Sequence, residues 1–282
     1  MTTDTATETE RVGAPAALAV RLERVAMSFA SAAGPHTALE GLDLDVPAGS
    51  LTVVIGPNGC GKSTLLRVIA GLLIPTSGEV ALGEAPDARA PRAGDGRVGL
   101  AFQQPRLVPW LSTLDNVALP MSLAGAPLPE RRERARVALE RVGLAEAASS
   151  RPAHLSGGMA QRAALARALA GDPPILLLDE PFSALDALTR EGFDAELEAL
   201  WMSRRRTVVM VTHSVGEAVR MADRIAVMTT RPGSVARVIP VDLPRPRPTA
   251  LAGDPAAAAI DAEVRAALAE VQTPELTPWL DR

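Results

Sequence analysis

The chain is organised around one stretch, Gly56-Pro57-Asn58-Gly59-Cys60-Gly61-Lys62-Ser63-Thr64. Before it stands the apolar run 51–55, which predicts a short buried strand, and after it residues 65–70 predict a helix. The pattern G-x-x-x-x-G-K-[ST] between a strand and a helix is a phosphate-binding loop. Its glycines let backbone N–H groups face an anion, and the positive end of the helix dipole strengthens the attraction. The stretch therefore predicts a nucleoside triphosphate site.

All nine residues of this loop, 56–64, are expected to contact the nucleotide. Lys62 should reach the β- and γ-phosphates, and the hydroxyl of Ser63 should bind Mg²⁺. Cys60 has two interpretations. It lies near a helix N-terminus, where the pKa of a thiol falls and its reactivity rises, or it is a small loop residue of which only the backbone matters. We favour the second interpretation and expect Cys60→Ser to retain ATPase activity.

Composition narrows the class of protein. The 282 residues suit one large α/β domain with an insertion, or two small domains, and 47% are hydrophobic, which is ample for a core. The net charge of −4 argues against a nucleic-acid partner. A single cysteine excludes an internal disulfide and a cysteine-based metal site, which fits a reducing compartment. Residues 1–11 lack a basic signal region, and no apolar run reaches the length of a membrane span, so we expect a cytoplasmic protein.

The first half of the chain mixes strand and helix patterns. Residues 1–17 are polar and are expected to be disordered. Residues 18–22 and 42–46 alternate apolar and polar side chains, as half-exposed antiparallel strands do. Between them Phe29 stands alone among small residues, either as a core side chain or as a platform on which adenine stacks. Residues 113–170 are largely helical in pattern.

The second half begins with strands of another kind. The run 175–178 is entirely apolar, as in a parallel strand that is covered on both faces, and further strands are expected at 207–211 and 225–228. The tail opens with Pro-rich text at 243–248, which predicts an extended linker. It closes with a helix for which Asp254 is the expected N-cap.

Three polar side chains follow the predicted parallel strands. Asp179 and Glu180 close the strand 175–178, and His213 follows the next one. Because ligands bind at the carboxyl ends of parallel strands, all three should lie at the phosphate site. Asp179 then fits the acid that organises Mg²⁺, and Glu180 fits the group that polarises the attacking water. A lone histidine is usually structural, but the position of His213 favours a role in the site.

A second anion-binding pattern lies far from the first. Ser156 and the glycines after it precede a long Ala-rich helix, where free N–H groups and the helix dipole favour a phosphate. The phosphate-binding loop already forms a complete cradle by itself. We therefore expect this second group to act on the nucleotide of another copy of the chain. The residues concerned are Leu155, Ser156, Gly157, Gly158 and Met159.

These motifs, in this order over residues 18–240, resemble the ATP-binding subunits of ABC transporters. The matching segments are the Walker A text GPNGCGKST, Gln103 in AFQQP, the signature LSGGM, the Walker B text ILLLDE, the D-loop and His213 in VTHS. The D-loop consists of Ser183, Ala184, Leu185 and Asp186. Ser214 departs from the aspartate that is commonest after the histidine, which affects only local hydrogen bonding.

The resemblance implies an α/β fold with a RecA-like P-loop NTPase core, an antiparallel β-subdomain and a helical subdomain inserted at about 104–170. Residues 241–282 form a C-terminal extension of linker and helix. The resemblance also implies a head-to-tail homodimer that holds two ATP molecules between each Walker A and the opposing signature. Phe29 would stack on adenine, Gln103 would bind Mg²⁺, and His213 would contact the γ-phosphate.

The text Arg106-Leu107-Val108-Pro109-Trp110 narrows the resemblance to the nitrate, sulfonate, taurine and bicarbonate importers. It implies two integral-membrane permease subunits as partners, with Arg106, Leu107 and Trp110 at the contact, and indirectly an extracytoplasmic solute-binding protein. Trp110 is either buried among helices or an aromatic anchor for a permease helix. The chain would then lie at the cytoplasmic face of the cell membrane as a peripheral subunit.

Two other functions fit the sequence less well. A soluble ABC ATPase that acts on nucleic acid or ribosomes is the main alternative, but such proteins carry a coiled-coil insertion or two fused ATPase domains, and this chain is acidic. A small-molecule kinase would leave the signature and His213 without a role. The sequence favours an ATPase that energises an importer of a small anionic solute.

Overall fold

The computed structural model describes residues 16–30, 34–183, 187–247, 251 and 253–272. Its larger sheet has the strand order β5-β6-β7-β3-β8-β9. In that order the strands span Val98–Ala101, Ile175–Asp179, Thr207–Thr212, Leu51–Ile55, Arg224–Met228 and Val235–Pro240. All neighbours are parallel except β8 and β9.

A smaller antiparallel sheet has the order β2-β1-β4, with bounds His36–Val46, Val20–Phe29 and Ser77–Leu82. The helices are α1 (Lys62–Ile69), α2 (Thr113–Leu123), α3 (Leu128–Arg141), α4 (Gly157–Ala170), α5 (Ala187–Ser203), α6 (Val215–Met221) and α7 (Pro255–Val271). Two short 3₁₀ turns, η1 (Ala145–Ala147) and η2 (Pro152–His154), connect α3 to α4. Within the described ranges, no helix has both the length and the apolar character needed to cross a membrane.

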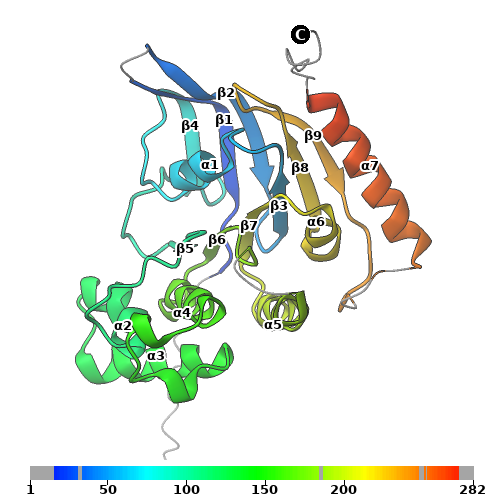
Figure 1. Ribbon diagram of the computed structural model, residues 1–282. Helices are drawn as coiled ribbons and strands as arrows, with labels where there is room; N and C mark the ends of the chain where they lie inside the picture. Colours follow the sequence, from blue (N-terminus) through cyan, green and yellow to red (C-terminus); the bar gives the residue numbers. More distant parts are fainter. Residues whose placement is uncertain (1–15, 31–33, 184–186, 248–250, 252, 273–282) are drawn as a thin grey trace, which may run out of the picture.

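Two apolar cores lie on opposite faces of the larger sheet. One joins that sheet to α1 and to the smaller sheet, and the other joins it to the helices α2 to α7. Every residue of β3, β6 and β7 is buried, as their continuous apolar text predicts for parallel strands covered on both faces. Figure 1 shows α2, α3 and α4 grouped beyond β5 and β6, with α7 along the outer edge beside β9.

The expected helices and parallel strands are confirmed, but the smaller sheet is more extensive than the sequence indicates. Strand β1 continues from the predicted residues 18–22 to Phe29, and β2 begins at His36 rather than near residue 42. The pairing of β1 with β2 shifts register between Leu22 and Val25 and again towards Ser28. Each bulge interrupts the alternation of apolar and polar side chains, and so the period of two is lost.

Strand β9 has no counterpart among the expected elements. It pairs antiparallel with β8, and only Ile239 of its six residues is buried. Because three of its side chains in a row are exposed, the text carries no alternation that could be recognised. Helix α7, in contrast, begins as expected, with the Asp254 carboxylate accepting hydrogen bonds from the N–H groups of Ala256 and Ala257.

Candidate functional site

The phosphate-binding loop joins the end of β3 to the first turn of α1. Gly61, at the N-cap, has a φ of 100°, and a Cβ there would lie 2.7 Å from the Leu39 Cδ2 and 2.9 Å from the Ala38 carbonyl oxygen. No side chain of Gly61 caps the helix, so the first-turn N–H groups of α1 remain available to an anion. The Lys62 ammonium donates hydrogen bonds to the Gly56 and Pro57 carbonyl oxygens at 2.8 and 3.0 Å.

Asp179 lies beside this loop at the end of β6. Its carboxylate accepts a hydrogen bond of 3.1 Å from the Ser63 hydroxyl, across 116 residues of sequence. Burial raises the pKa of the Asp179 carboxyl; the hydrogen bond from Ser63 lowers it and the charge of Glu180 raises it, so that the net shift is upward. Ser63 and Asp179 are two of the three residues that the sequence assigns to Mg²⁺, and Gln103 is the third.

Glu180 brings three separate loops together. Its Oε2 accepts a hydrogen bond of 3.1 Å from the Gln103 side-chain amide, and lies 3.4 Å from the His213 Nδ1. The backbone at Glu180 has a φ of 46°, in the left-handed region that costs a non-glycine residue energy, and its N–H donates to the Val211 carbonyl on β7. The exposed fraction of the side chain is 15% for Glu180 and 62% for His213, so the histidine faces the open side.

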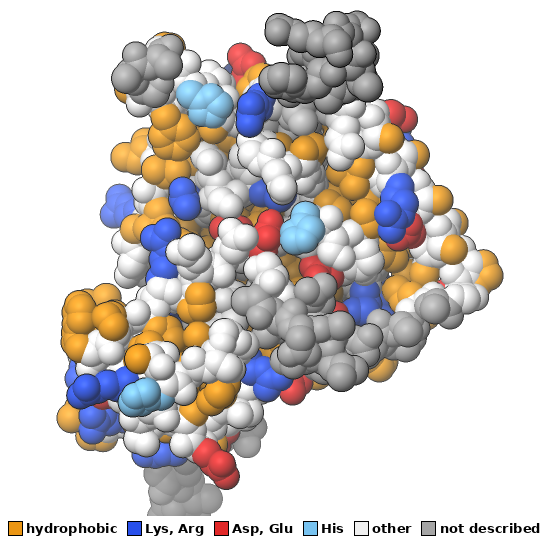
Figure 2. Space-filling view, in the orientation of Figure 1, with side chains coloured by type: hydrophobic (Ala, Val, Ile, Leu, Met, Phe, Trp, Pro, Cys, Tyr) orange, Lys and Arg blue, Asp and Glu red, His pale blue; other side chains and the backbone are white. Residues whose placement is uncertain are grey.

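Many of the predicted site residues line a cleft of about 570 Å³, whereas Gly56, Pro57, Cys60 and Asp179 do not line it. It is lined by Phe29, His36, Ala38, Asn58, Gly59, Gly61, Lys62, Ser63, Thr64, Gln103, Glu180 and His213. Figure 2 shows acidic side chains and a histidine gathered at the middle of this face. The structure thus brings together most of the predicted nucleotide residues. His36 was not predicted; it pairs with Phe29 across β1 and β2, and a lone exposed histidine carries no sequence signal.

The donor set suits a magnesium ion that arrives with a nucleotide. Nowhere in the described chain do three or more His, Cys, Asp or Glu side chains form a cluster that could hold a metal. Mg²⁺ is commonly held by one or two carboxylates together with substrate phosphates and waters. Asp179, Ser63 and Gln103 beside a phosphate cradle match that requirement.

Ser214 directly follows His213 and starts α6. It is the N-cap of α6, where its hydroxyl accepts a hydrogen bond of 3.3 Å from the Glu217 N–H. The Thr212 hydroxyl in turn donates to the Glu217 carboxylate at 2.5 Å and accepts from the Ser214 N–H at 3.1 Å. These bonds tie the residues on either side of His213 to the first turn of α6, so serine serves the local hydrogen bonding at this position.

The signature residues lie away from this cleft. Ser156 is exposed and caps α4, accepting a hydrogen bond of 3.2 Å from the Met159 N–H. Leu155 and Met159 pack on the core that holds the helices α2 to α7, whereas α1 belongs to the core on the other face of the sheet. Of the D-loop, Ser183 donates a hydrogen bond to the Glu180 carbonyl oxygen, and Ala184, Leu185 and Asp186 lie outside the described residues.

The three residues predicted to contact the permease, which follow Gln103, differ in their surroundings. Trp110 is 74% exposed, so the alternative of burial among the helices is wrong. Leu107 is partly buried against the helical core. The Arg106 guanidinium lies 5.0 Å from the centre of the Phe102 ring, and its carbonyl oxygen accepts a hydrogen bond from Arg167.

Cys60 is a buried side chain with 1% exposure. Burial is the largest influence on its thiol and raises the pKa, while the charge of Lys62 lowers it by less. The interpretation as a thiol activated by the helix N-terminus is therefore wrong. The thiol instead fills the space beneath Gly56, where an added Cβ would lie 2.9 Å from its sulfur.

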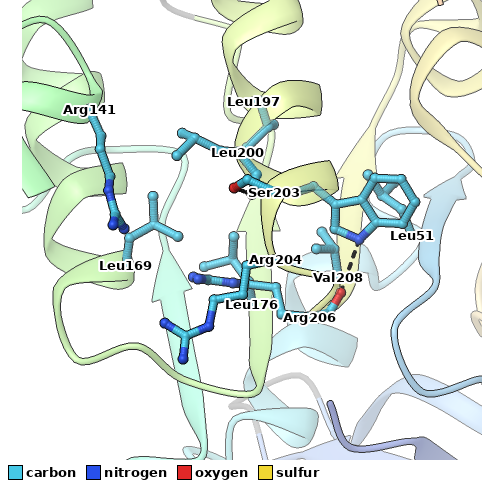
Figure 3. A pocket seen from close by; sticks show the side chains of 11 residues that line it. Leu51, Arg141, Leu169, Leu176, Leu197, Leu200, Ser203, Arg204, Arg206 and Val208 are labelled. Carbon is cyan, nitrogen blue, oxygen red and sulfur yellow. Dashed lines mark hydrogen bonds between the residues drawn. The ribbon is translucent and has the colours of Figure 1, made fainter. Parts of the chain in front are cut away.

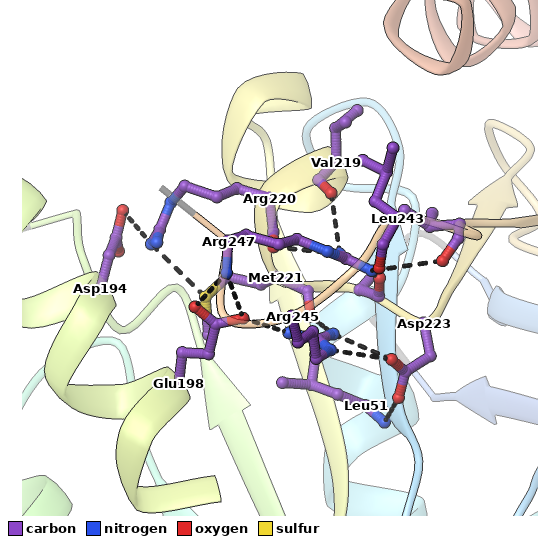
Figure 4. A network of polar contacts seen from close by, with 12 residues as sticks. Leu51, Asp194, Glu198, Val219, Arg220, Met221, Asp223, Leu243, Arg245 and Arg247 are labelled. Atoms are coloured by element: carbon purple, nitrogen blue, oxygen red, sulfur yellow. Dashed lines mark hydrogen bonds and ion pairs between the residues drawn. The ribbon is translucent and has the colours of Figure 1, made fainter. Parts of the chain in front are cut away.

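The Pro-rich segment after β9, expected as an extended linker, bends at residues 245–246 and carries two arginines, Arg245 and Arg247, with buried side chains. The Arg247 guanidinium donates to the carbonyl oxygens of Val219, Arg220 and Ala222 at the end of α6, at 3.1, 3.0 and 2.6 Å. The Arg245 guanidinium donates to Glu198 of α5 at 2.6 Å (Figure 4). The alternation of Pro and Arg gave no sign that these cations are buried.

Comparison with known proteins agrees with this site. The family described as ABC transporter matches residues 39–183. The aliphatic sulfonates import ATP-binding protein SsuB 1 of Mesorhizobium japonicum is 49% identical over 214 residues, which cover 76% of this chain and 77% of that protein. The SsuB protein of Pseudomonas entomophila is 48% identical over 231 residues, which cover 82% and 80%.

Among solved structures, the dimeric ATP-binding cassette MJ0796 in a post-hydrolysis state with ADP and Pi has a TM-score of 0.71 and 35% identity. The match covers 79% of this chain and 99% of that one, and the likeness confirms the RecA-like P-loop fold with its antiparallel and helical subdomains. The chain therefore belongs to the ATP-binding subunits of ABC transporters and is an ATPase coupled to transport.

Proposed function

We propose that this chain energises an importer of a small anionic solute of the aliphatic sulfonate, taurine or nitrate class. The observation that supports the class is that several relatives 46–49% identical to this chain are named for the import of aliphatic sulfonates. The segment from Arg106 to Trp110 resembles the same branch. This subunit binds ATP and does not contact the solute. The identity of the solute is therefore determined by the permease with which the chain assembles.

The geometry of the cleft suggests a role for each residue. Phe29 stacks on adenine, residues 56–64 hold the phosphates, and Lys62 exchanges its two loop carbonyls for phosphate oxygens. Ser63, Asp179 and Gln103 would hold Mg²⁺, which when bound neutralises charge on the β- and γ-phosphates. Glu180 and His213 act at the end of the cleft.

Glu180 is the residue on which hydrolysis depends. Gln103 and His213 both contact its Oε2, and its side chain, which lines the cleft, is 15% exposed. A carboxylate in this position orients a water for attack on the γ-phosphate and accepts its proton. His213, on the open side, contacts the γ-phosphate.

The site is completed by a second copy of the chain. Ser156 with the neighbouring N–H groups of α4 forms an anion site that is exposed and separate from the cleft of its own chain. In a head-to-tail homodimer, Leu155 to Met159 would close over the partner's ATP, and the D-loop would lie between the two sites. ATP binding then closes the dimer and hydrolysis opens it.

This motion would be passed to two integral-membrane permease subunits. Trp110 is exposed on the helical side and fits an aromatic anchor for a permease helix, with Arg106 and Leu107 beside it. The helical subdomain of about 104–170 would carry this surface, and the extension 241–282 would pack on the ATPase domain 18–240. The chain is then peripheral at the cytoplasmic face of the membrane, and a solute-binding protein acts indirectly from the other side.

The dimer is tested with Glu180→Gln. We expect ATPase turnover to fall by about 10²–10⁴-fold, because the general base is lost while the shape is kept. With ATP, this variant should sediment as a dimer. Glu196→Gln, an exposed carboxylate on α5, is the control and should resemble the parent. A Glu180→Gln chain that stays monomeric at saturating ATP contradicts the proposed sandwich.

The solute class is tested in the organism that carries the chain. Inactivation should abolish growth on an alkanesulfonate or taurine as sulfur source, or on nitrate as nitrogen source, while growth on sulfate and ammonium stays normal. Restoration by the parent chain, and not by Glu180→Gln, ties the phenotype to ATP hydrolysis. Normal growth on all of these sources would rule out the proposed class without touching the ATPase.

A further inference from the structure

A pocket of about 250 Å³ lies at the end of the larger sheet opposite to the nucleotide cleft. It is bounded by the first residues of β3, β6 and β7 and by the last turns of α3, α4 and α5, and most of its walls are apolar (Figure 3). Leu169, Leu176, Leu197 and Val208 contribute to these walls. Since β3 and β6 end at the nucleotide cleft, this pocket is distinct from it.

The remaining walls are cationic. Arg141 comes from the end of α3, and Arg204 and Arg206 from the turn after α5 (Figure 3). Asp172 is the acidic partner: its carboxylate pairs with Arg204 and accepts from the Arg206 Nη2 at 3.1 Å. Arg204 and Arg206 share this one carboxylate, and the lining of the pocket contains three arginines and no Asp or Glu, which leaves an excess of positive charge beside an apolar surface.

Arg206 is the group whose surroundings are incomplete. Its exposed fraction is 7%, and its Nε and Nη1 are buried without a hydrogen-bond partner in the part of the chain that the structure describes. Burial lowers its pKa, and the charges of Arg204 and Arg141 lower it further against the effect of Asp172. A buried guanidinium with two unpaired donors is costly, and an anion would relieve that cost.

We propose that this pocket binds a small amphiphilic anion, a short aliphatic chain that ends in a carboxylate, sulfonate or phosphate group. The apolar chain lies against the leucines, and the head group reaches the guanidinium groups of Arg204 and Arg206, the latter after a rotation of its terminal torsion. Engineered apolar cavities of about 150 Å³ already accept a ring of six carbons, so this volume suits a chain of about six carbons with its head group. The site is independent of the proposed transport function.

Calorimetry on the full chain with hexanesulfonate, hexanoate and hexyl phosphate tests the proposal. Saturating ADP is present throughout, so that the phosphate-binding loop is occupied. We expect a Kd on the order of 0.1–1 mM for at least one of the three, which identifies the head group. Hexanol, which has no charge, and sulfate, which has no chain, should each bind at least about tenfold more weakly.

Two variants keep the outcome independent of folding. Arg204→Gln removes a half-exposed cation and should weaken binding about tenfold. Leu200→Trp fills the pocket from a partly exposed helix position and should abolish binding. Arg21→Gln, an exposed arginine on β1, is the matched control and should bind normally. Absence of binding at 10 mM anion (roughly ten times the upper Kd expected), equal binding of sulfate, or unchanged binding by Leu200→Trp would overturn the proposal.

Discussion

Cys60 shows how one side chain can lie in an active loop without taking part in its chemistry. Its backbone belongs to the phosphate cradle, whereas its thiol is turned inward among Gly56, Lys62 and the core beneath the loop. Because burial raises the thiol pKa, less of it is thiolate at neutral pH than in an exposed cysteine. The residue is therefore structural at this scale.

Cys60→Ser should keep ATPase activity within about twofold, because the phosphate contacts of the loop come from the backbone. It should also lower stability by about 1 kcal/mol, since a hydroxyl is less suited to this buried space. Iodoacetamide at neutral pH should modify the native parent far more slowly than the urea-unfolded chain. Rapid labelling of the native protein, or loss of turnover with nucleotide binding intact, would contradict this account.

Gly233 packs directly against the backbone of the same loop at Cys60. A Cβ there would overlap the Cys60 carbonyl oxygen and lie 2.9 Å from the Met228 Cε. The backbone of Gly233 also bonds to β2, donating to the Ala38 carbonyl at 3.0 Å and accepting from the Glu40 N–H at 3.1 Å. The position therefore has no room to move away from the loop.

Gly233→Ala should accordingly displace the phosphate-binding loop. We expect ATP affinity, measured with a fluorescent nucleotide, to fall at least about tenfold, and the melting temperature to fall by several degrees. Gly216→Ala is the matched control, because on α6 the nearest atom to an added Cβ is 4.0 Å away. An unchanged affinity in Gly233→Ala would show that this contact does not position the loop.

Among the elements, α6 is the one that most depends on its surroundings. It has seven residues, begins two positions after His213, and would be marginal as an isolated helix. Ser214 caps its start, and the Arg247 guanidinium caps its end through three carbonyl oxygens. Burial lowers the pKa of Arg247 to about 10, so the group is still charged at neutral pH. The C-terminal segment thus holds the helix that follows His213.

Arg247→Ala should destabilise the protein by about 3–5 kcal/mol, because three carbonyls at the end of α6 and those of Val241 and Leu243 lose a buried charged donor, while the backbone N–H that bonds Glu198 is kept. Arg247→Lys should restore little, since one ammonium cannot reproduce the planar set of donors. Urea unfolding measures both variants. Arg265→Ala, which removes an exposed arginine of α7, should change stability by no more than about 1 kcal/mol. Equal effects of Arg247→Ala and Arg265→Ala would refute the capping role.

At the scale of the whole molecule, the larger sheet separates the phosphate-binding loop from Ser156. The phosphate-binding loop leads into α1 on one side, and Ser156 starts α4 on the other. A single chain cannot place both on one nucleotide without a large rearrangement of its cores. Assembly is therefore expected to control activity.

The specific ATPase activity of the isolated chain should rise with protein concentration until the dimer is saturated. Ser156→Arg should lose this activity yet bind nucleotide normally, because its own phosphate-binding loop is intact. Turnover assays over a hundredfold range of concentration, together with sedimentation, measure both effects. A specific activity that is constant while the chain sediments as a monomer would show that one chain suffices.

The sequence by itself determined the features that depend on neighbouring residues. The phosphate-binding loop, the buried run that ends in Asp179 and Glu180, and the cap of α7 are each contained in fewer than ten consecutive residues. Their physics is local, because backbone conformation, helix dipoles and strand burial follow from short patterns. Because parallel strands end at the same edge of the sheet, the sequence also placed His213 at that edge.

Only the tertiary structure decided which of these groups touch and which are buried. The contact of Glu180 with Gln103 spans 77 residues, and that of Ser63 with Asp179 spans 116. The burial of the Cys60 thiol, of Arg247 and of Arg206 depends on surfaces brought together from distant segments. Local pattern cannot report this, because desolvation and partner choice are properties of the packed molecule.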